Sequence, residues 1–135
     1  MIVQSCPNNV DIYGQAVLRK YNNTDSPVIT TPNQSRVIFP INGELTGFIE
    51  CTTSMKVNFS LFVESMNILL GQMLTNLESE SDLLVRLEPP ILSEKEFETD
   101  QYEISTNLMY ELNTLAKSYD CKILFYANKH KAKEV

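Results

Sequence analysis

The strongest hydrophobic pattern in the chain lies between residues 58 and 77. Apolar side chains there fill well over half of a helical circumference, and the polar positions recur every three or four residues. We therefore predict a long, mostly buried helix that begins at about Asn58 or Ser60, either of which can serve as an N-cap, and ends at about Leu77. The one polar stripe left to meet water or a partner comprises Ser60, Glu64, Asn67, Gly71, Thr75 and Glu78.

Two β-prone runs flank Asn42-Gly43, at residues 35–41 and 44–53. Asn-Gly between such runs is a strong hairpin signal, because both central positions of a type I′ turn need a positive φ. We predict a hairpin with that turn. Gly47, inside the second run, indicates a bulge or a close approach of another segment.

The remaining segments give weaker signals. Residues 10–21 fit neither period well and slightly favour strand over a short helix, whereas 22–35 are rich in Asn, Thr, Ser and Pro and indicate an irregular stretch. Residues 83–92 indicate a short strand stopped by Pro89-Pro90, and 122–127 form a β-branched and aromatic run typical of a strand.

Residues 105–119 allow two interpretations. Their apolar side chains keep a helical spacing, which favours a helix, but the short loop before residue 122 suits a hairpin partner equally well. With either choice, the order of elements predicts an α+β fold: a single domain, residues 1–135, in which a mostly antiparallel sheet packs with one long buried helix.

The charge and the distribution of apolar residues argue against several classes of function. A net charge of −6 and a pI near 4.7 argue against a nucleic-acid surface, which needs clustered Lys and Arg. The N-terminal residues lack the basic and apolar regions of a signal peptide, and no window reaches the roughly 18 apolar residues of a membrane span. We expect a cytoplasmic protein.

Conventional catalytic groups are scarce. Three cysteines without a C-x-x-C spacing indicate neither a disulfide framework nor a zinc site, and Cys51 and Cys121 are most simply small buried hydrophobes. His130 stands alone in the tail, so a histidine triad or metal site has little to be built from. We expect no metal or cofactor of the chain's own.

Glu64 and Asn67 are the candidate chemistry. On adjacent turns their Cβ atoms lie about 5 to 6 Å apart, so a charged acceptor and a planar amide reach the same volume. The simpler interpretation is a solvated helix face. Gly71 fits that interpretation less well, because a mid-helix glycine costs roughly 0.5 to 1 kcal/mol relative to alanine.

The stretch from Glu64 to Gly71 resembles the E-x-x-N-x-x-x-G signature of the CheC/CheX/FliY phosphatases, which act on the phosphorylated response regulator CheY. Residues 42–49 are similar to the G-x-x-x-G hairpin of that family, and 87–92 to its proline-containing strand entry. A single E-x-x-N copy favours the CheX type.

The resemblance implies a CheC-like fold and hydrolysis of an aspartyl phosphate on a receiver domain. Glu64 would pair with the receiver's active-site lysine and Asn67 would orient the water, while Gly71 and Ser60 would contact the partner. The Mg²⁺ belongs to the receiver. The family also implies a homodimer.

The chain departs from the family in two regions. Only residues 52–58 separate the hairpin from the helix, where CheX proteins carry another helix, and the N-terminal region is more strand-like. These departures keep a second hypothesis open: a non-catalytic interaction or adaptor module of the same fold.

Overall fold

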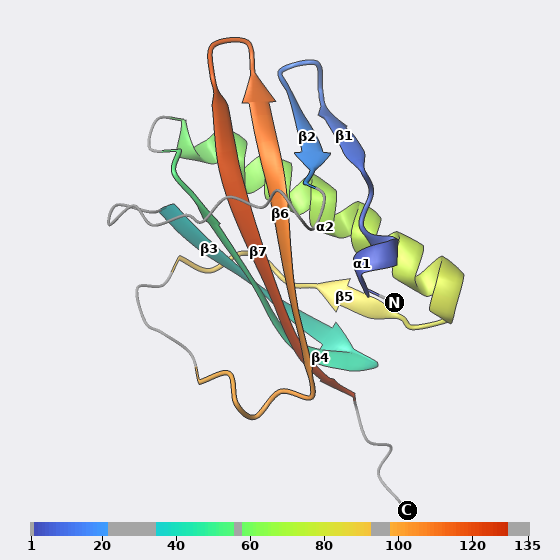
Figure 1. The fold of residues 1–135 in the computed structure, drawn as a ribbon. Coiled ribbons are helices and arrows are strands. Elements are labelled where there is room, and N and C mark those ends of the chain that lie inside the picture. The colour runs from blue at the N-terminus through green and yellow to red at the C-terminus, as the bar shows by residue number, and fades with distance from the viewer. Residues whose placement is uncertain (1, 22–34, 56–57, 93–97, 130–135) are drawn as a thin grey trace, which may run out of the picture.

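The computed structural model describes residues 2–21, 35–55, 58–92 and 98–129. Within these ranges, seven antiparallel strands form one sheet in the order β1-β2-β6-β7-β4-β3-β5, curved into a half-barrel (Figure 1). The elements are α1 (Ile2–Ser5), β1 (Asn9–Ile12), β2 (Ala16–Lys20), β3 (Ser35–Gly43), β4 (Leu45–Thr53), α2 (Phe59–Ser81), β5 (Val85–Leu87), β6 (Ile104–Thr114) and β7 (Ser118–Lys129).

The α+β, CheC-like fold class predicted from the sequence is wrong. The described residues form a mostly-sheet half-barrel with one helix of 23 residues rather than a helix-packed α+β domain. A β1–β2 hairpin that the sequence did not specify, and the β6–β7 hairpin that it allowed as one of two interpretations, extend the sheet. The strand preference at residues 10–21 is confirmed, in two strands instead of one.

Residues 104–114 form a strand, so the helical option for 105–119 is wrong and the strand option is confirmed. β6 pairs with β7 from Ile104↔Ala127 to Asn113↔Ser118. The helix-like spacing arises because Leu108 faces the main core while its neighbour Met109 is buried outside that core cluster. Burial on both faces of a strand blurs the alternation from which strands are recognised.

The hairpin at Asn42-Gly43 is confirmed as β3–β4, but its turn is not the predicted type I′ turn. The pairing of Ile41 with Gly47 centres the turn on Glu44, and of the Asn-Gly pair only Gly43 has a positive φ, 128°. Asn42 and Gly43 remain in β3, where they pair with β5. The added edge strand moves the turn further along the chain.

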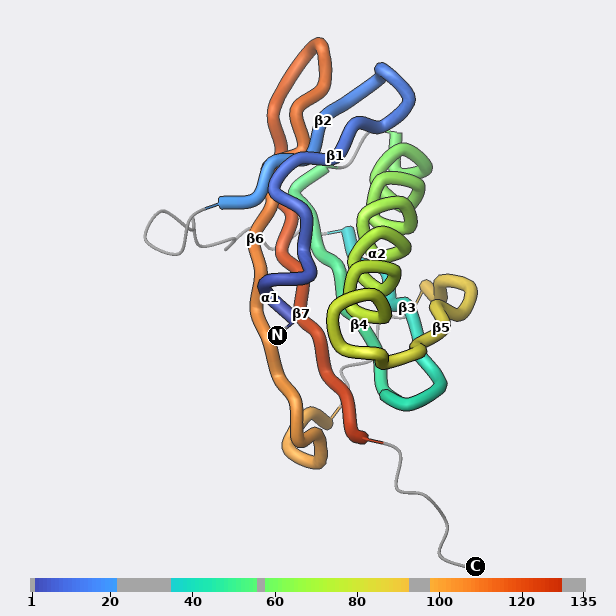
Figure 2. Tube along the Cα trace, turned by 90° about the vertical axis from the view of Figure 1, so that its right-hand side faces the viewer, coloured from blue at the N-terminus to red at the C-terminus, as the bar shows by residue number. Residues whose placement is uncertain are grey.

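The helix α2 packs its apolar side against the inner face of the sheet, and Figure 2 shows it lying on one side of the strands. Burying a Leu, Met or Phe side chain contributes roughly 1.5 to 3 kcal/mol of transfer free energy. The buried Ser65 hydroxyl donates to the Leu61 carbonyl at 2.6 Å. The buried residues of α2 are Leu61, Phe62, Ser65, Met66, Leu69, Leu70, Met73, Leu74 and Leu77.

The start of α2 agrees with the prediction, but its C-terminal end and the way its N-terminus is capped do not. The helix runs on to Ser81, four residues past Leu77. Asn58 is the N-cap residue, but its φ of 60° is left-handed and its side chain makes no capping hydrogen bond. Instead, the Leu61 N–H donates to the Asn58 carbonyl at 3.1 Å, which closes the first turn through the backbone.

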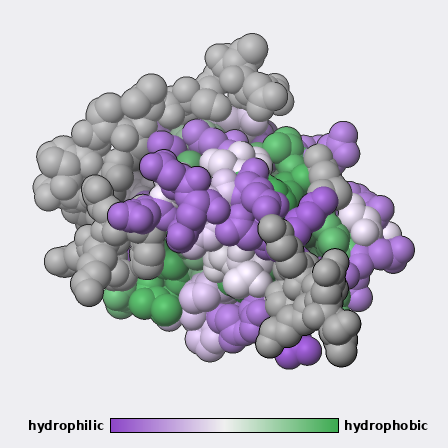
Figure 3. Space-filling model, turned by 90° about the horizontal axis from the view of Figure 1, so that it is seen from below, coloured by the Kyte–Doolittle hydropathy of each residue, from purple (hydrophilic) through white to green (hydrophobic). Residues whose placement is uncertain are grey.

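The surface seen from below is polar over much of the visible face, with hydrophobic residues in separate patches (Figure 3). No helix among the described residues is long and apolar enough to cross a membrane. The predicted irregular stretch at 22–35 lies, except for Ser35, outside the described residues.

Gly47 of β4 lies at a close approach to the backbone of β7. A Cβ added to Gly47 would stand 2.0 Å from the Tyr126 carbonyl oxygen and 2.8 Å from the Ala127 Cα, both backbone atoms of β7. The close approach that the sequence indicated at Gly47 is therefore present, and it requires a residue without a side chain.

We expect Gly47→Ala to lower the free energy of unfolding by at least about 2 kcal/mol, because the backbone of a central strand must shift to admit the methyl group. Urea denaturation followed by circular dichroism measures the change. A loss below about 0.5 kcal/mol would contradict the close packing of β4 on β7.

Candidate functional site

The polar stripe of α2 faces solvent. Ser60, Glu64, Asn67, Thr75 and Glu78 are exposed, and Gly71 is half-buried. Any interpretation of Glu64 and Asn67 as a site requires both to lie on an open surface, and the fold meets this requirement. The apolar side of the helix sets their direction, because its burial against the sheet fixes the rotation of α2.

Glu64 and Asn67 are not engaged elsewhere in the described part of the protein. Neither side chain makes a hydrogen bond or ion pair with a described residue, where the one ion pair is Arg36–Glu50 at 3.0 Å. A carboxylate and an amide without internal partners interact with water or with a bound molecule. Their polar atoms are therefore available to an external group.

An open hollow of about 560 Å³ lies beside the N-terminal half of α2. Ser60, Glu64 and Asn67 form its polar side. Its other lining residues are apolar: Val37 of β3, Phe59 and Val63 of α2, and Pro90 and Leu92 from the segment after β5.

A second open hollow, also about 560 Å³, follows the helix toward its C-terminus. It is lined by Asn67, Ile68, Gly71, Gln72, Thr75 and Asn76. Asn67 borders both hollows, so its amide occupies the middle of the concave surface along α2.

Gly71 has no packing reason within the described structure. A Cβ added there would meet no atom within 4 Å, and its φ lies outside the left-handed range. The stripe therefore has a gap at Gly71 that the fold does not require. The prediction that Gly71 provides clearance for a partner remains consistent with this open space.

Sequence reasoning missed the wall opposite the helix. Pro89-Pro90 indicated only the end of a strand, yet Pro90 and Leu92 line the hollow beside Glu64. The segment is held there by an isolated bridge in which Ile38 and Ile91 exchange backbone hydrogen bonds of 3.0 and 2.7 Å. This contact across some fifty residues leaves no local signal in the sequence.

The cysteines offer no accessible nucleophile. Cys6, Cys51 and Cys121 are all buried and free, which confirms the prediction for Cys51 and Cys121. Burial raises the pKa of Cys6 to about 11, an effect that the nearby Lys20 partly offsets. Burial also raises the pKa of Cys121 to about 12 and that of Cys51 well above its usual value.

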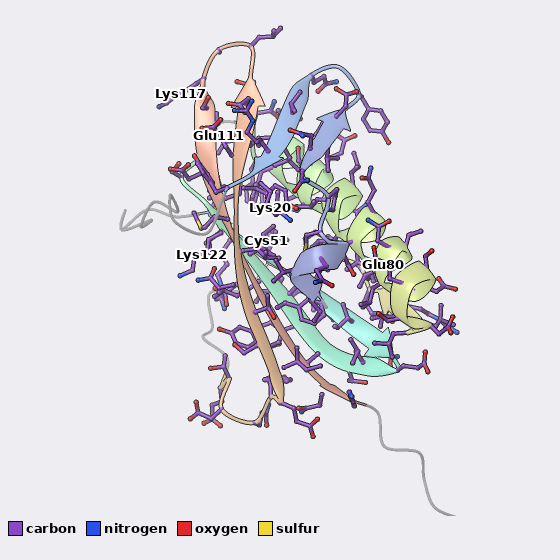
Figure 4. All side chains as sticks on the ribbon, turned by 45° about the vertical axis from the view of Figure 1, so that its right-hand side comes forward. Lys20, Cys51, Glu80, Glu111, Lys117 and Lys122 are labelled. Carbon is purple, nitrogen blue, oxygen red and sulfur yellow. The ribbon has the colours of Figure 1, made fainter. Side chains whose placement is uncertain are left out.

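The other polar contacts serve the fold. Lys20 donates to the Cys6 carbonyl at 3.2 Å beside α1, and Glu80 of α2 accepts from Ser5 at 3.1 Å (Figure 4). The Tyr21 hydroxyl donates to Asp120 at 2.6 Å and contacts Glu111 at 3.0 Å. Desolvation, followed by these two carboxylates, raises the pKa of Tyr21. The described residues contain no cluster of three metal-ligating side chains.

Comparisons with known proteins leave the family open. No protein-family model matches the sequence, and no curated protein matches it. Among solved structures, the chain is similar to one in the crystal structure of the CheX–CheY–BeF₃–Mg²⁺ complex from Borrelia burgdorferi, with 13% sequence identity and a TM-score of 0.46. The match covers 76% of this chain and 80% of that one. At these values the likeness identifies neither the family nor the activity.

We expect Gly71→Ala to raise the free energy of unfolding by about 0.5 to 1 kcal/mol, because alanine favours the helix and its methyl group meets open space. Gly14→Ala is the matched control. Its added Cβ also meets no atom, but its φ of 72° strains an alanine, so that variant should be less stable. A destabilised Gly71→Ala protein would contradict the assignment of open space.

Proposed function

We propose that this chain is a phosphatase that accelerates hydrolysis of the aspartyl phosphate on a response-regulator receiver domain. The observation that carries the proposal is the pair Glu64 and Asn67, exposed on adjacent turns of α2 and without partners among the described residues. Their spacing with Gly71 is that of the E-x-x-N-x-x-x-G signature, which gives the pair a specific chemistry.

In the proposed reaction, water attacks phosphorus and the bond between phosphorus and the aspartyl oxygen breaks. The products are inorganic phosphate and the free aspartate of the receiver. The Asn67 amide offers an oxygen that accepts from water and an N–H₂ group that donates. It can thus hold the attacking water in line without itself gaining or losing a proton.

Glu64 supplies charge complementarity instead of acid–base chemistry. Its carboxylate would pair with the cationic lysine beside the phosphorylated aspartate, which fixes the position of α2 over the receiver. Mg²⁺ on the receiver is part of the substrate and neutralises charge on the phosphoryl group. Phosphoryl transfer depends mainly on positioning and electrostatics, so two side chains suffice.

Ser60 and Gly71 flank the pair along the stripe and are proposed as partner contacts. Ser60 lies one turn before Glu64 on the same hollow, where its hydroxyl can donate or accept. Gly71 lies one turn beyond Asn67 in open space, where a partner's backbone can approach α2.

We expect Asn67→Ala to lower kcat for receiver dephosphorylation by about 10²-fold with little change in KM, because the water loses its orientation while docking persists. Glu64→Gln should raise KM and lower kcat, because the ion pair forms in both the complex and the transition state. Phosphate release from single-domain CheY-like receivers of the same genome, phosphorylated with acetyl phosphate, measures both constants.

The matched control is Glu78→Gln, which removes a carboxylate from the same exposed stripe outside both hollows. It should behave like the native protein. If the native protein turns over none of these receivers but binds one, the adaptor hypothesis replaces the phosphatase. Unchanged turnover in the double variant Glu64→Ala and Asn67→Ala would also reject the assigned roles.

A further inference from the structure

The hollow beside Glu64 has an apolar wall that phosphate chemistry does not need. Its polar groups lie on α2, and across from them stand Pro90 and Leu92. A phosphoryl group or an ordered water gains nothing from these hydrocarbon surfaces. The wall therefore requires an explanation separate from Asn67 and the reaction.

The wall is exposed at a free-energy cost. Leu92, which lines the hollow together with Pro90, is 70% exposed. The floor beneath them is Val37, which is fully buried in the core. Exposed apolar side chains that border a concave, polar-rimmed surface are typical of interaction sites.

The wall is also held in place before any partner binds. Ile91 is fixed to β3 by the two backbone hydrogen bonds with Ile38, and the preceding Pro89-Pro90 restricts the backbone on the other side. An apolar surface that is already ordered loses little entropy on binding, which favours its use as a docking contact.

We propose that this hollow, lined by Phe59, Val63, Pro90 and Leu92 beside Glu64, is a docking socket for an apolar side chain on the receiver. The inference rests on the proposed function and adds the chemistry of the partner surface. Glu64 has no partner among the described residues, and the net charge is −6. Both favour a basic surface on the receiver around that apolar side chain.

A receiver fits the socket better than other occupants. The hollow is open and shares Ser60, Glu64 and Asn67 with the proposed catalytic surface, so one partner can engage both at once. A second copy of this chain seated there would cover Glu64 and Asn67 and block the substrate. A small apolar molecule would not use the carboxylate.

The socket predicts an effect on binding that is separate from the chemical step. Leu92→Ala should raise KM for the phosphorylated receiver about tenfold with kcat unchanged, because an apolar anchor is lost but the water is still oriented. Leu92→Met, which keeps an apolar side chain of similar volume, should restore KM. Titration calorimetry with the same receivers, activated with beryllofluoride, measures Kd independently of turnover.

The matched control is Leu115→Ala. Leu115 is 99% exposed at the β6–β7 turn, so the same truncation there should leave KM and Kd at native values. Native KM and Kd in Leu92→Ala would overturn the socket while the proposed function stands. If the native protein binds a receiver without turnover and Leu92→Ala weakens that binding, the socket stands and the phosphatase fails.

Three further outcomes would also reject the receiver as occupant. The first is that none of the single-domain CheY-like receivers of the same genome binds. The second is a native dimer that Leu92→Glu converts to a monomer, which would assign the hollow to a second copy. The third is a small molecule that co-purifies with the protein and whose binding requires Leu92. If its removal leaves Kd for the receiver unchanged, the receiver does not occupy the hollow.

Discussion

The packing of α2 against the sheet is the constraint on which the candidate site depends. Nine buried residues along one face of the helix fix its rotation, and a turn of about 100° in either direction would move apolar side chains into water. The same rotation leaves Glu64 and Asn67 outside. The hydrophobic core therefore sets the direction of the two polar groups, and a substitution in the core can misplace them.

The site combines two parts with different physical requirements. The polar pair needs only a rigid spacing, which one turn of helix supplies from residues three apart. The apolar wall needs to stand at a set distance from that helix, and only tertiary structure can provide it. The bridge between Ile38 and Ile91 ties the wall to β3, and β3 also contributes Val37 to the floor. The wall and the floor of the hollow are therefore held by the same strand.

Features that depend on interactions between residues close in sequence could be predicted, whereas features that depend on distant contacts could not. The helix, its polar stripe and the hairpin around Asn42-Gly43 were predictable because their signals lie within a few residues. The strand at 104–114 was ambiguous because Leu108 and Met109 are buried on opposite faces. The fold class was wrong because sheet curvature and the joining of separate hairpins into one sheet depend on pairing between distant strands. The predicted turn type was wrong because Asn42 and Gly43 pair with β5 and therefore remain in β3.

The strand order has a consequence for the time course of folding. β2, at residues 16–20, pairs with β6, at residues 104–114. β4 likewise pairs with β7, which is synthesised much later. During synthesis the β1–β2 hairpin therefore emerges from the ribosome long before its partner, with an unpaired strand edge available to other chains. Such distant pairings slow folding and favour aggregation of nascent chains. The protein's yield in a cell would thus depend on how these early strands are protected until β6 is made.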